Sequence, residues 1–378
     1  MSELYIGLMS GTSLDGVDGV IADFDPGDGR PLRVLAHSHI PFDAVLATEL
    51  LALNSPAGAN ELQRAALAAN GLARHYAAAV AELLATAQLP RDAINAVGVH
   101  GQTVRHRPRE LDGIGFTLQL NQPALLAELA GIDIVCDFRT RDITAGGQGA
   151  PLAPAFHRVM FGSDRETRGV LNLGGISNLT VLRSGSATLG FDCGPGNALM
   201  DHWCARHTGR PFDDGGAWAA SGRVLEPLLA ELLADPYFAV TPPKSTGRDL
   251  FNPPWLDDRL RSAEPACAAM QAVDVQATLA EFTAAACAND LLRHAPDAAE
   301  LLVCGGGAFN AHLLQRLAAR LGSGVRVLRT DERGLPPTQV ESCAFAWLAR
   351  AHVKREALDL GSVTGARGPR VLGALYPR

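Results

Sequence analysis

The sequence has no closely spaced cysteine pair, no long apolar run and no surplus of basic residues. Its seven cysteines are scattered and odd in number, and none lies in a Cys-x-x-Cys pair. This pattern argues against a zinc site and a disulfide framework, and free thiols indicate a reducing compartment. No apolar stretch reaches about 18 residues, and the N-terminus has no basic segment typical of a signal peptide. We therefore expect no membrane association and a cytoplasmic location.

Charge and composition narrow the class of protein further. A formal net charge of −7 gives the chain no general affinity for nucleic acid or for an anionic membrane. Any phosphate site must then be local, built from backbone N–H groups or a few arginines. Hydrophobic residues make up 47% of the 378 residues, which is typical of a globular protein with a sizeable core. At roughly 100–200 residues per domain, the length favours two domains.

Two parts of the chain show the same order of expected elements: two strands around a turn of small residues, a third strand and then a helical stretch. These elements are residues 4–9, 17–24, 34–40 and 49–87 in the first part, and residues 169–173, 176–182, 187–191 and 197–207 in the second. Strands that alternate with helices predict an α/β fold. The glycine-rich segment 139–154 is the best candidate for a hinge or domain crossing. We therefore expect an N-terminal α/β domain of residues 1–138, which the C-terminal segment could join, and a C-terminal α/β domain of residues 139–378.

Three turns of small residues are candidate phosphate-binding sites, because glycine lets backbone N–H groups approach phosphate oxygens closely. The chain has no Walker A motif and no G-x-G-x-x-G spacing at these turns, which disfavours a P-loop and a dinucleotide fold. Each turn taken alone can also be an ordinary connection between elements. The candidate residues are Gly11, Thr12, Ser13, Leu14, Asp15, Gly16, Val17 and Asp18 in the first turn, Gly174 and Gly175 in the second, and Gly305, Gly306 and Gly307 in the third.

Polar residues at the ends of expected strands are candidates for catalysis and substrate binding. Asp192 ends a strand beside a loop that should be exposed, where a carboxylate is a good general base, although Asp is also a common turn residue. Further polar residues follow buried strands, where ligands collect in open α/β sheets, and an arginine there can hold a carboxylate bidentately. These are His100, Gln102, Arg139 and Arg141, for which loop hydrogen bonds and surface ion pairs are the alternatives.

One further segment is a candidate binding site. Residues 243–248 fit either an anion-binding loop or a solvated basic loop. The histidines lack the spacing of metal ligands, so we predict no metal cage made by the protein.

Taken together, these segments resemble the anhydro-N-acetylmuramic acid kinase family. The motifs Gly-x-Met-Ser-Gly-Thr-Ser-Leu-Asp-Gly and Gly-Phe-Asp-Cys-Gly-Pro-Gly-Asn are specific to that family, and both occur here without departure. The matching stretches follow the family's order and span almost the full chain. They are residues 7–18, 98–105, 137–154, 172–178, 190–201, 243–248, 303–310 and 341–348.

The resemblance implies a two-domain actin/hexokinase-like (ribonuclease-H-like) fold with ATP in a cleft between the domains. The three glycine turns would hold ATP, and Mg²⁺ would arrive with it. The family forms homodimers and acts on a small amino sugar: water opens 1,6-anhydro-N-acetylmuramic acid, and its carbon-6 oxygen takes the γ-phosphate of ATP.

The resemblance also implies roles for individual residues. Asp192 would be the base that activates the water, and Arg139 and Arg141 would meet the lactyl carboxylate of the sugar. Glu341 would be a polar partner of the substrate, with helix capping as its alternative role. The competing hypotheses are a kinase or phosphatase of the same fold for another substrate, and a non-enzymatic, actin-like nucleotide switch.

Overall fold

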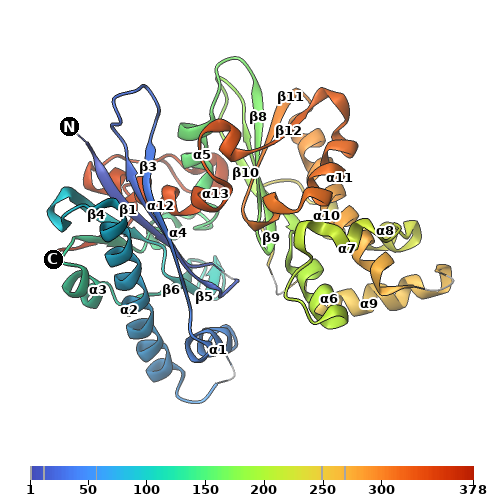
Figure 1. The fold of residues 1–378 in the computed structure, drawn as a ribbon, viewed down its shortest axis with the longest axis horizontal. Helices are drawn as coiled ribbons and strands as arrows, with labels where there is room; N and C mark the ends of the chain where they lie inside the picture. The colour runs from blue at the N-terminus through green and yellow to red at the C-terminus, as the bar shows by residue number, and fades with distance from the viewer. Residues whose placement is uncertain (1, 12, 57, 248–249, 268–269) are drawn as a thin grey trace. The chain divides into compact units, whose positions relative to one another are not determined.

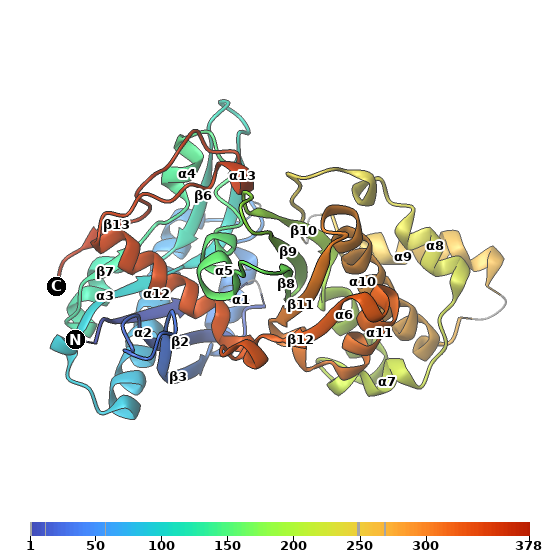
Figure 2. The same ribbon diagram turned by 90° about the horizontal axis from the view of Figure 1, so that it is seen from above.

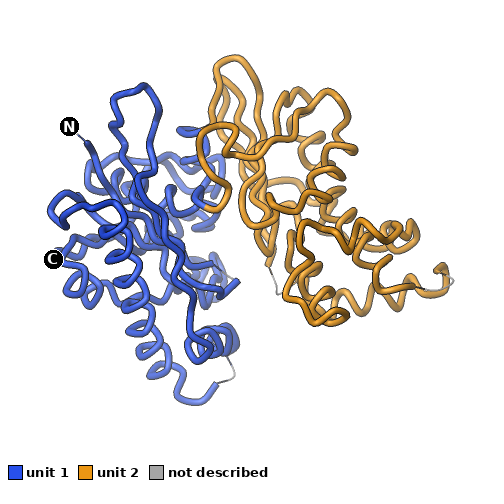
Figure 3. Tube along the Cα trace, viewed as in Figure 1, with its two compact units in different colours: residues 1–160, 339–378 blue, residues 161–338 orange. Residues whose placement is uncertain are grey.

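The computed structural model describes residues 2–11, 13–56, 58–247, 250–267 and 270–378 (Figure 1). The chain forms two compact units (Figure 3). Unit 1 comprises Met1–Met160 and Gln339–Arg378, and unit 2 comprises Phe161–Thr338. The sequence placed the change of domain at residue 139, whereas here residues 139–160 stay with unit 1 and the C-terminal segment returns to it. The described part of the chain contains no helix with the length and apolar character that a membrane span requires.

Unit 1 is built on a six-stranded sheet of order β13-β7-β4-β1-β2-β3. Strand β1 pairs antiparallel with β2 and parallel with β4, which puts the three meander strands at one edge and the parallel strands beside them. A separate hairpin of β5 and β6 follows β4. The strands are β1 (Leu4–Met9), β2 (Gly16–Asp23), β3 (Arg33–Pro41), β4 (Ile94–Val99), β5 (Gln102–Pro108), β6 (Gly115–Leu120), β7 (Ile134–Cys136) and β13 (Ala374–Tyr376).

Helices cover both faces of the unit 1 sheet. Ile6 and Leu8 of β1 join one core cluster with Leu72 of α2. Gly7 lies between them and so faces the other way, toward α12, where an added Cβ would lie 1.9 Å from the carbonyl oxygen of Ser342. Helix α12 therefore rests directly on the strand backbone. The helices are α1 (Ala44–Ala52), α2 (Glu61–Ala87), α3 (Pro123–Ala130), α4 (Thr140–Thr144), α5 (Ala153–Phe161), α12 (Val340–Val353) and α13 (Gly361–Thr364).

Unit 2 repeats this strand order in a five-stranded sheet, β10-β9-β8-β11-β12. Strands β8, β9 and β10 form an antiparallel meander, and β8, β11 and β12 are parallel. The repeated pattern that the sequence predicted is therefore present, and the α/β prediction is confirmed. The strands are β8 (Thr167–Leu173), β9 (Ile176–Leu182), β10 (Leu189–Pro195), β11 (Ala298–Cys304) and β12 (Arg326–Arg329).

The helices of unit 2 pack on one side of its sheet (Figure 2). Helix α10 is buried over most of its length and forms the centre of this layer. The helices are α6 (Ala198–Thr208), α7 (Ala217–Ala220), α8 (Glu226–Leu233), α9 (Pro253–Ala263), α10 (Ala272–His294) and α11 (Ala311–Leu321).

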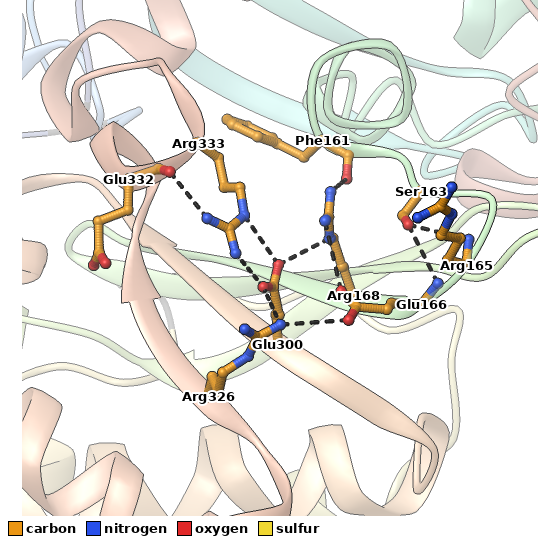
Figure 4. Close-up of polar contacts among 9 residues, drawn as sticks. All are labelled: Phe161, Ser163, Arg165, Glu166, Arg168, Glu300, Arg326, Glu332 and Arg333. Atoms are coloured by element: carbon orange, nitrogen blue, oxygen red, sulfur yellow. Dashed lines mark hydrogen bonds and ion pairs between the residues drawn. The ribbon is translucent and has the colours of Figure 1, made fainter.

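A buried carboxylate ties the three parallel strands of unit 2 together (Figure 4). The side chain of Glu300 in β11 is 0% exposed and forms ion pairs with Arg168 of β8 at 2.9 Å, Arg326 of β12 at 2.7 Å, and Arg333. Burial alone would raise the pKa of Glu300, but the three arginines outweigh it and hold that pKa below its ordinary value. The carboxylate is therefore charged and compensated.

Candidate functional site

Asp192 lies at a β-bulge in β10. Asp192 pairs with Asn178 of β9, and Gly194 pairs with the next residue, Ser177, so Cys193 is the extra residue of the bulge. Bulges bend a strand and change the direction of a side chain, and they are common beside active sites. The sequence placed Asp192 at the end of a strand beside an exposed loop, which is wrong: Asp192 lies within β10 (Leu189–Pro195), and residues 193–196 are buried. The bulge, rather than a strand end, positions the carboxylate.

Three hydrogen bonds hold Asp192 in place. The N–H of Thr246 donates to the carboxylate at 3.0 Å. The N–H of Asp192 donates to the carbonyl of Lys244 at 3.2 Å, and the hydroxyl of Tyr237 donates to the carbonyl of Asp192 at 2.7 Å. Both the main chain and the side chain of Asp192 are therefore fixed by the segment that follows α8.

The pKa of Asp192 suits general base chemistry. Burial raises this pKa to about 6, against the opposing effects of the Thr246 N–H and the Lys244 charge. A carboxylate with such a pKa is ionised at pH 7 and binds a proton more readily than an ordinary aspartate does. It can therefore take a proton from an attacking water.

The second and third glycine turns lie beside the end of β10. The N–H of Gly196 donates to the carbonyl of Gly175 at 3.0 Å, and a Cβ on Gly196 would lie 2.2 Å from the carbonyl oxygen of Gly174. A Cβ on Gly307 would lie 2.6 Å from the Cβ of Leu173, which precedes the second turn. Side chains at these positions would block the contact, so glycine allows three backbone segments to meet here.

The first predicted turn follows β1 in unit 1. The Gln102 side chain donates to the carbonyl of Gly11 at 3.0 Å, and the Ser13 hydroxyl donates to the Asp15 carboxylate at 2.7 Å. Gln102 is thus a support for the loop backbone. Of the other predicted residues, Leu14 has a φ of 59°, Gly16, Val17 and Asp18 belong to β2, and Thr12 lies outside the described residues.

Three of the predicted substrate residues gather in unit 1. The Nε2 of His100 accepts hydrogen bonds from Arg139 at 2.8 and 3.2 Å, and Arg139 also donates to the carbonyl of Gly149 at 2.7 Å. Burial and the Arg139 charge lower the pKa of His100 to about 3, so the ring is neutral. Glu341, at the start of α12, interacts electrostatically with Arg139 and Asp18, and burial raises its pKa.

Arg141 does not belong to this group. It lies in α4 with an exposed side chain, and among the described residues no hydrogen bond or ion pair involves its guanidinium group. The two arginines that were predicted for one role therefore have different surroundings. Arg139 has protein partners on Nε and on both terminal nitrogens, whereas Arg141 is available for a ligand.

Residues 243–248 were predicted to be either an anion-binding loop or a solvated basic loop, and for Lys244 the structure contradicts both predictions. Its side chain is buried and forms an ion pair of 2.9 Å with Asp290 of α10, so it is neither solvated nor open to an anion. One feature of the sequence could have indicated that Lys244 is buried: Asp290 is a charged residue within a largely apolar helix and needs a partner of opposite charge. Arg248 lies outside the part of the chain that the structure describes.

Comparisons with known proteins agree with one another along the whole chain. A family model described as anhydro-N-acetylmuramic acid kinase matches residues 3–378. A relative of that name from Variovorax paradoxus (strain S110) is 63% identical over 380 residues and covers 99% of both chains. Another of that name, from Albidiferax ferrireducens, is 57% identical over 397 residues and covers 100% of both.

Solved structures resemble the chain more distantly. The activator of the 2-hydroxyisocaproyl-CoA dehydratase from Clostridium difficile with bound ADPNP is 14% identical, with a TM-score of 0.46, over 94% of this chain and 96% of that one. A ROK family glucokinase from Streptomyces griseus in complex with glucose and AMPPNP is 14% identical, with a TM-score of 0.41, over 92% and 99%.

Proposed function

Because this chain belongs to the anhydro-N-acetylmuramic acid kinase family, we propose that Asp192 is the base that activates water in the family's reaction. The protein is an ATP-dependent kinase of cell-wall recycling with an actin/hexokinase-like fold. It opens 1,6-anhydro-N-acetylmuramic acid with water and phosphorylates it to N-acetylmuramic acid 6-phosphate.

Asp192 takes a proton as the water oxygen bonds to the anomeric carbon of the sugar. The bond from that carbon to the bridging oxygen breaks, and the oxygen, now on carbon 6 alone, bonds to the γ-phosphorus of ATP as ADP leaves. This is a variation on inverting glycoside hydrolysis, in which one carboxylate activates water on the far face. No general acid is needed, because the phosphoryl group captures the leaving oxygen.

The observation that carries this proposal is the position of Asp192. A single carboxylate with a raised pKa stands at a bulge in β10, the strand whose end contacts the second glycine turn through Gly196, and the third turn has no room for a Cβ at Gly305 or Gly307. A non-enzymatic nucleotide switch would need the glycine turns to bind the nucleotide but would not need a general base, so Asp192 favours an enzyme.

The nucleotide is assigned to the glycine turns. The proposed ATP residues are Gly11, Ser13, Leu14, Asp15, Gly16, Val17 and Asp18 in unit 1, and Gly174, Gly175, Gly305, Gly306 and Gly307 in unit 2. That the two sets bind the same nucleotide stays a prediction. Mg²⁺ bound with ATP would neutralise charge on the transferred phosphoryl group, and it needs only one or two carboxylates besides the phosphates. Asp15 and Asp18 are the carboxylates of the first turn. One oxygen of Asp15 accepts the Ser13 hydroxyl and one oxygen of Asp18 lies 3.0 Å from Nδ1 of His39, so the other oxygen of each would hold the metal.

Polar groups of unit 1 are proposed to contact the sugar. Gln102 and Glu341 are the proposed polar contacts, and His100, whose two ring nitrogens bind Arg139 and the Ser10 carbonyl, would contact the sugar through its ring carbons. We give the lactyl carboxylate to Arg141, because the nitrogens of Arg139 already bind His100 and Gly149. Arg139 then orients His100.

A homodimer and a cytoplasmic location are also proposed. The support for the homodimer is the family resemblance. The cytoplasmic location is supported by the seven cysteines, none of which forms a disulfide within the described residues.

The test is ADP release with the anhydro sugar by wild type and Asp192→Asn. We expect the variant to lose at least about 100-fold in turnover while ATP binding, measured by calorimetry, is unchanged. Near-normal turnover would remove Asp192 from the mechanism. A panel that includes glucose and polyphosphate tests the second candidate, another substrate of the same fold.

A further inference from the structure

Lys244 and Asp290 form a deeply buried ion pair in unit 2. The ammonium nitrogen lies 2.9 and 3.3 Å from the two carboxylate oxygens, and the side chains are 1% and 5% exposed. Removing two charges from water is costly, and an apolar pair of similar volume is often as stable. Stability alone therefore does not explain the pair.

The pair is connected to Asp192 through two residues. The carbonyl of Lys244 accepts the N–H of Asp192, and the Lys244 ammonium lies 4.9 Å from the ring centroid of Tyr237 and 5.5 Å from that of Phe191. The hydroxyl of the same Tyr237 donates to the Asp192 carbonyl. Moving Lys244 would thus disturb the backbone of Asp192 on both sides.

Besides Asp192 itself, Lys244 and Asp290 are the buried charged side chains in this environment, within the ranges that the structure describes. Burial raises the pKa of Tyr237 and of Cys193 and lowers the pKa of His294, and each of these shifts favours the neutral form of the group. Cys287 faces Cys193, and Arg293 is exposed at the end of α10. The Lys244 charge opposes the effect of burial on Asp192.

We propose that Lys244, held by Asp290, is a positioning residue that keeps the Asp192 carboxylate ionised and oriented for catalysis. This inference rests on the proposed role of Asp192 as base. The pair itself touches no substrate. The charge of Lys244 acts electrostatically on the Asp192 carboxylate. The carbonyl of Lys244 holds the main chain of β10 at Asp192.

The test is the pH profile of kcat for the variant Lys244→Met/Asp290→Leu, which removes both charges and leaves neither unpaired. We expect the acid limb to move up by about one pH unit, because an opposite charge nearby lowers a carboxylate pKa by about that amount or more. Turnover then falls about fivefold at pH 6 and stays near that of wild type at pH 8. KM for both substrates at pH 8 should not change.

Two further variants separate this role from a structural one. Lys244→Arg keeps the positive charge, so the acid limb of its kcat pH profile should lie at the same pH as that of wild type. Glu281→Gln breaks another buried ion pair on α10, with Arg316 and Arg320, and should lower stability without moving the limb. If the apolar double variant is insoluble, Lys244→Gln/Asp290→Asn removes the same charges.

Asp192→Asn is measured in parallel. If it retains turnover, the proposed function of Asp192 fails. If it is inactive while the charge-free double variant keeps an acid limb near pH 6, only the positioning role of Lys244 is overturned. A loss of turnover that is equal at pH 6 and pH 8 also overturns it.

Discussion

His100 and Arg139 are joined through the imidazole Nε2, which lies 2.8 Å from a terminal nitrogen of the guanidinium group. Because an arginine has no acceptor, the Nε2 atom must accept, and the proton of the neutral ring is on Nδ1. The Nδ1 atom lies 3.3 Å from the carbonyl of Ser10, which can accept that proton. The ring is thus fixed in one tautomer between the first glycine turn and Arg139.

Replacing Arg139 with methionine should destabilise unit 1. The change leaves Glu341 without the cation that lowers its pKa, so we expect a loss of about 2–4 kcal/mol in the free energy of unfolding at pH 8. The pKa of Glu341, already raised by burial, rises further in the variant. The free-energy cost of the unpaired Glu341 carboxylate disappears as the pH falls through this raised pKa, because the carboxylate then binds a proton. Urea denaturation should therefore show a smaller loss at pH 5. An equal loss at both pH values would contradict this account.

Replacing Glu300 with glutamine should destabilise unit 2 by about 3 kcal/mol or more, because three arginines lose their shared counter-charge. Since the pKa of Glu300 is lowered by folding, its contribution is complete above its ordinary value of 4.5 and is lost as the pH falls through the lowered pKa. The matched control is Glu166→Gln, which loses only longer pairs at 3.4 and 3.6 Å with two of the same arginines. Its effect on thermal unfolding should be within about 1 kcal/mol.

Local patterns predicted most of the elements that carry the candidate site. The strands at residues 4–9 and 176–182 agree with β1 and β9, because apolar runs report burial directly. The tail after Lys354 adds β13, which was not among the expected strands. That strand is three exposed residues long and exists only through its pairing with β7, which no local pattern encodes.

Contacts between distant residues could not be predicted in the same way. Lys244 looks like a surface residue in the sequence, and its burial depends on Asp290, 46 positions further along. Similarly, Arg139 looks like a free carboxylate binder until the fold brings His100 and Gly149 to it. The sequence shows which side chains are charged, but which residue each of them pairs with depends on the tertiary structure.

Replacing Asp192 with asparagine should stabilise the protein while it removes activity. Folding raises the pKa of Asp192 from an ordinary 3.8 to about 6, so the ionised side chain costs stability above pH 6. We expect the variant to gain about 1–2 kcal/mol in the free energy of unfolding at pH 8, since this carboxylate keeps some contact with water. The gain should shrink as the pH falls from 6 to 4, because wild type then binds a proton. Urea denaturation at pH 8, 6 and 4.5 measures it, and a gain independent of pH would contradict the raised pKa.

Replacing Arg141 with alanine should weaken sugar binding and leave the fold intact. The guanidinium has no partner among the described residues, so its loss should change the melting temperature little. If it binds the lactyl carboxylate, KM for the anhydro sugar should rise about 10- to 100-fold while KM for ATP is unchanged, which is the effect of one charge-assisted hydrogen bond or two. The decisive comparison uses the 1,6-anhydro sugar without its lactyl group, on which wild type and Arg141→Ala should have equal kcat/KM. If the variant is impaired equally on both sugars, Arg141 does not recognise the carboxylate.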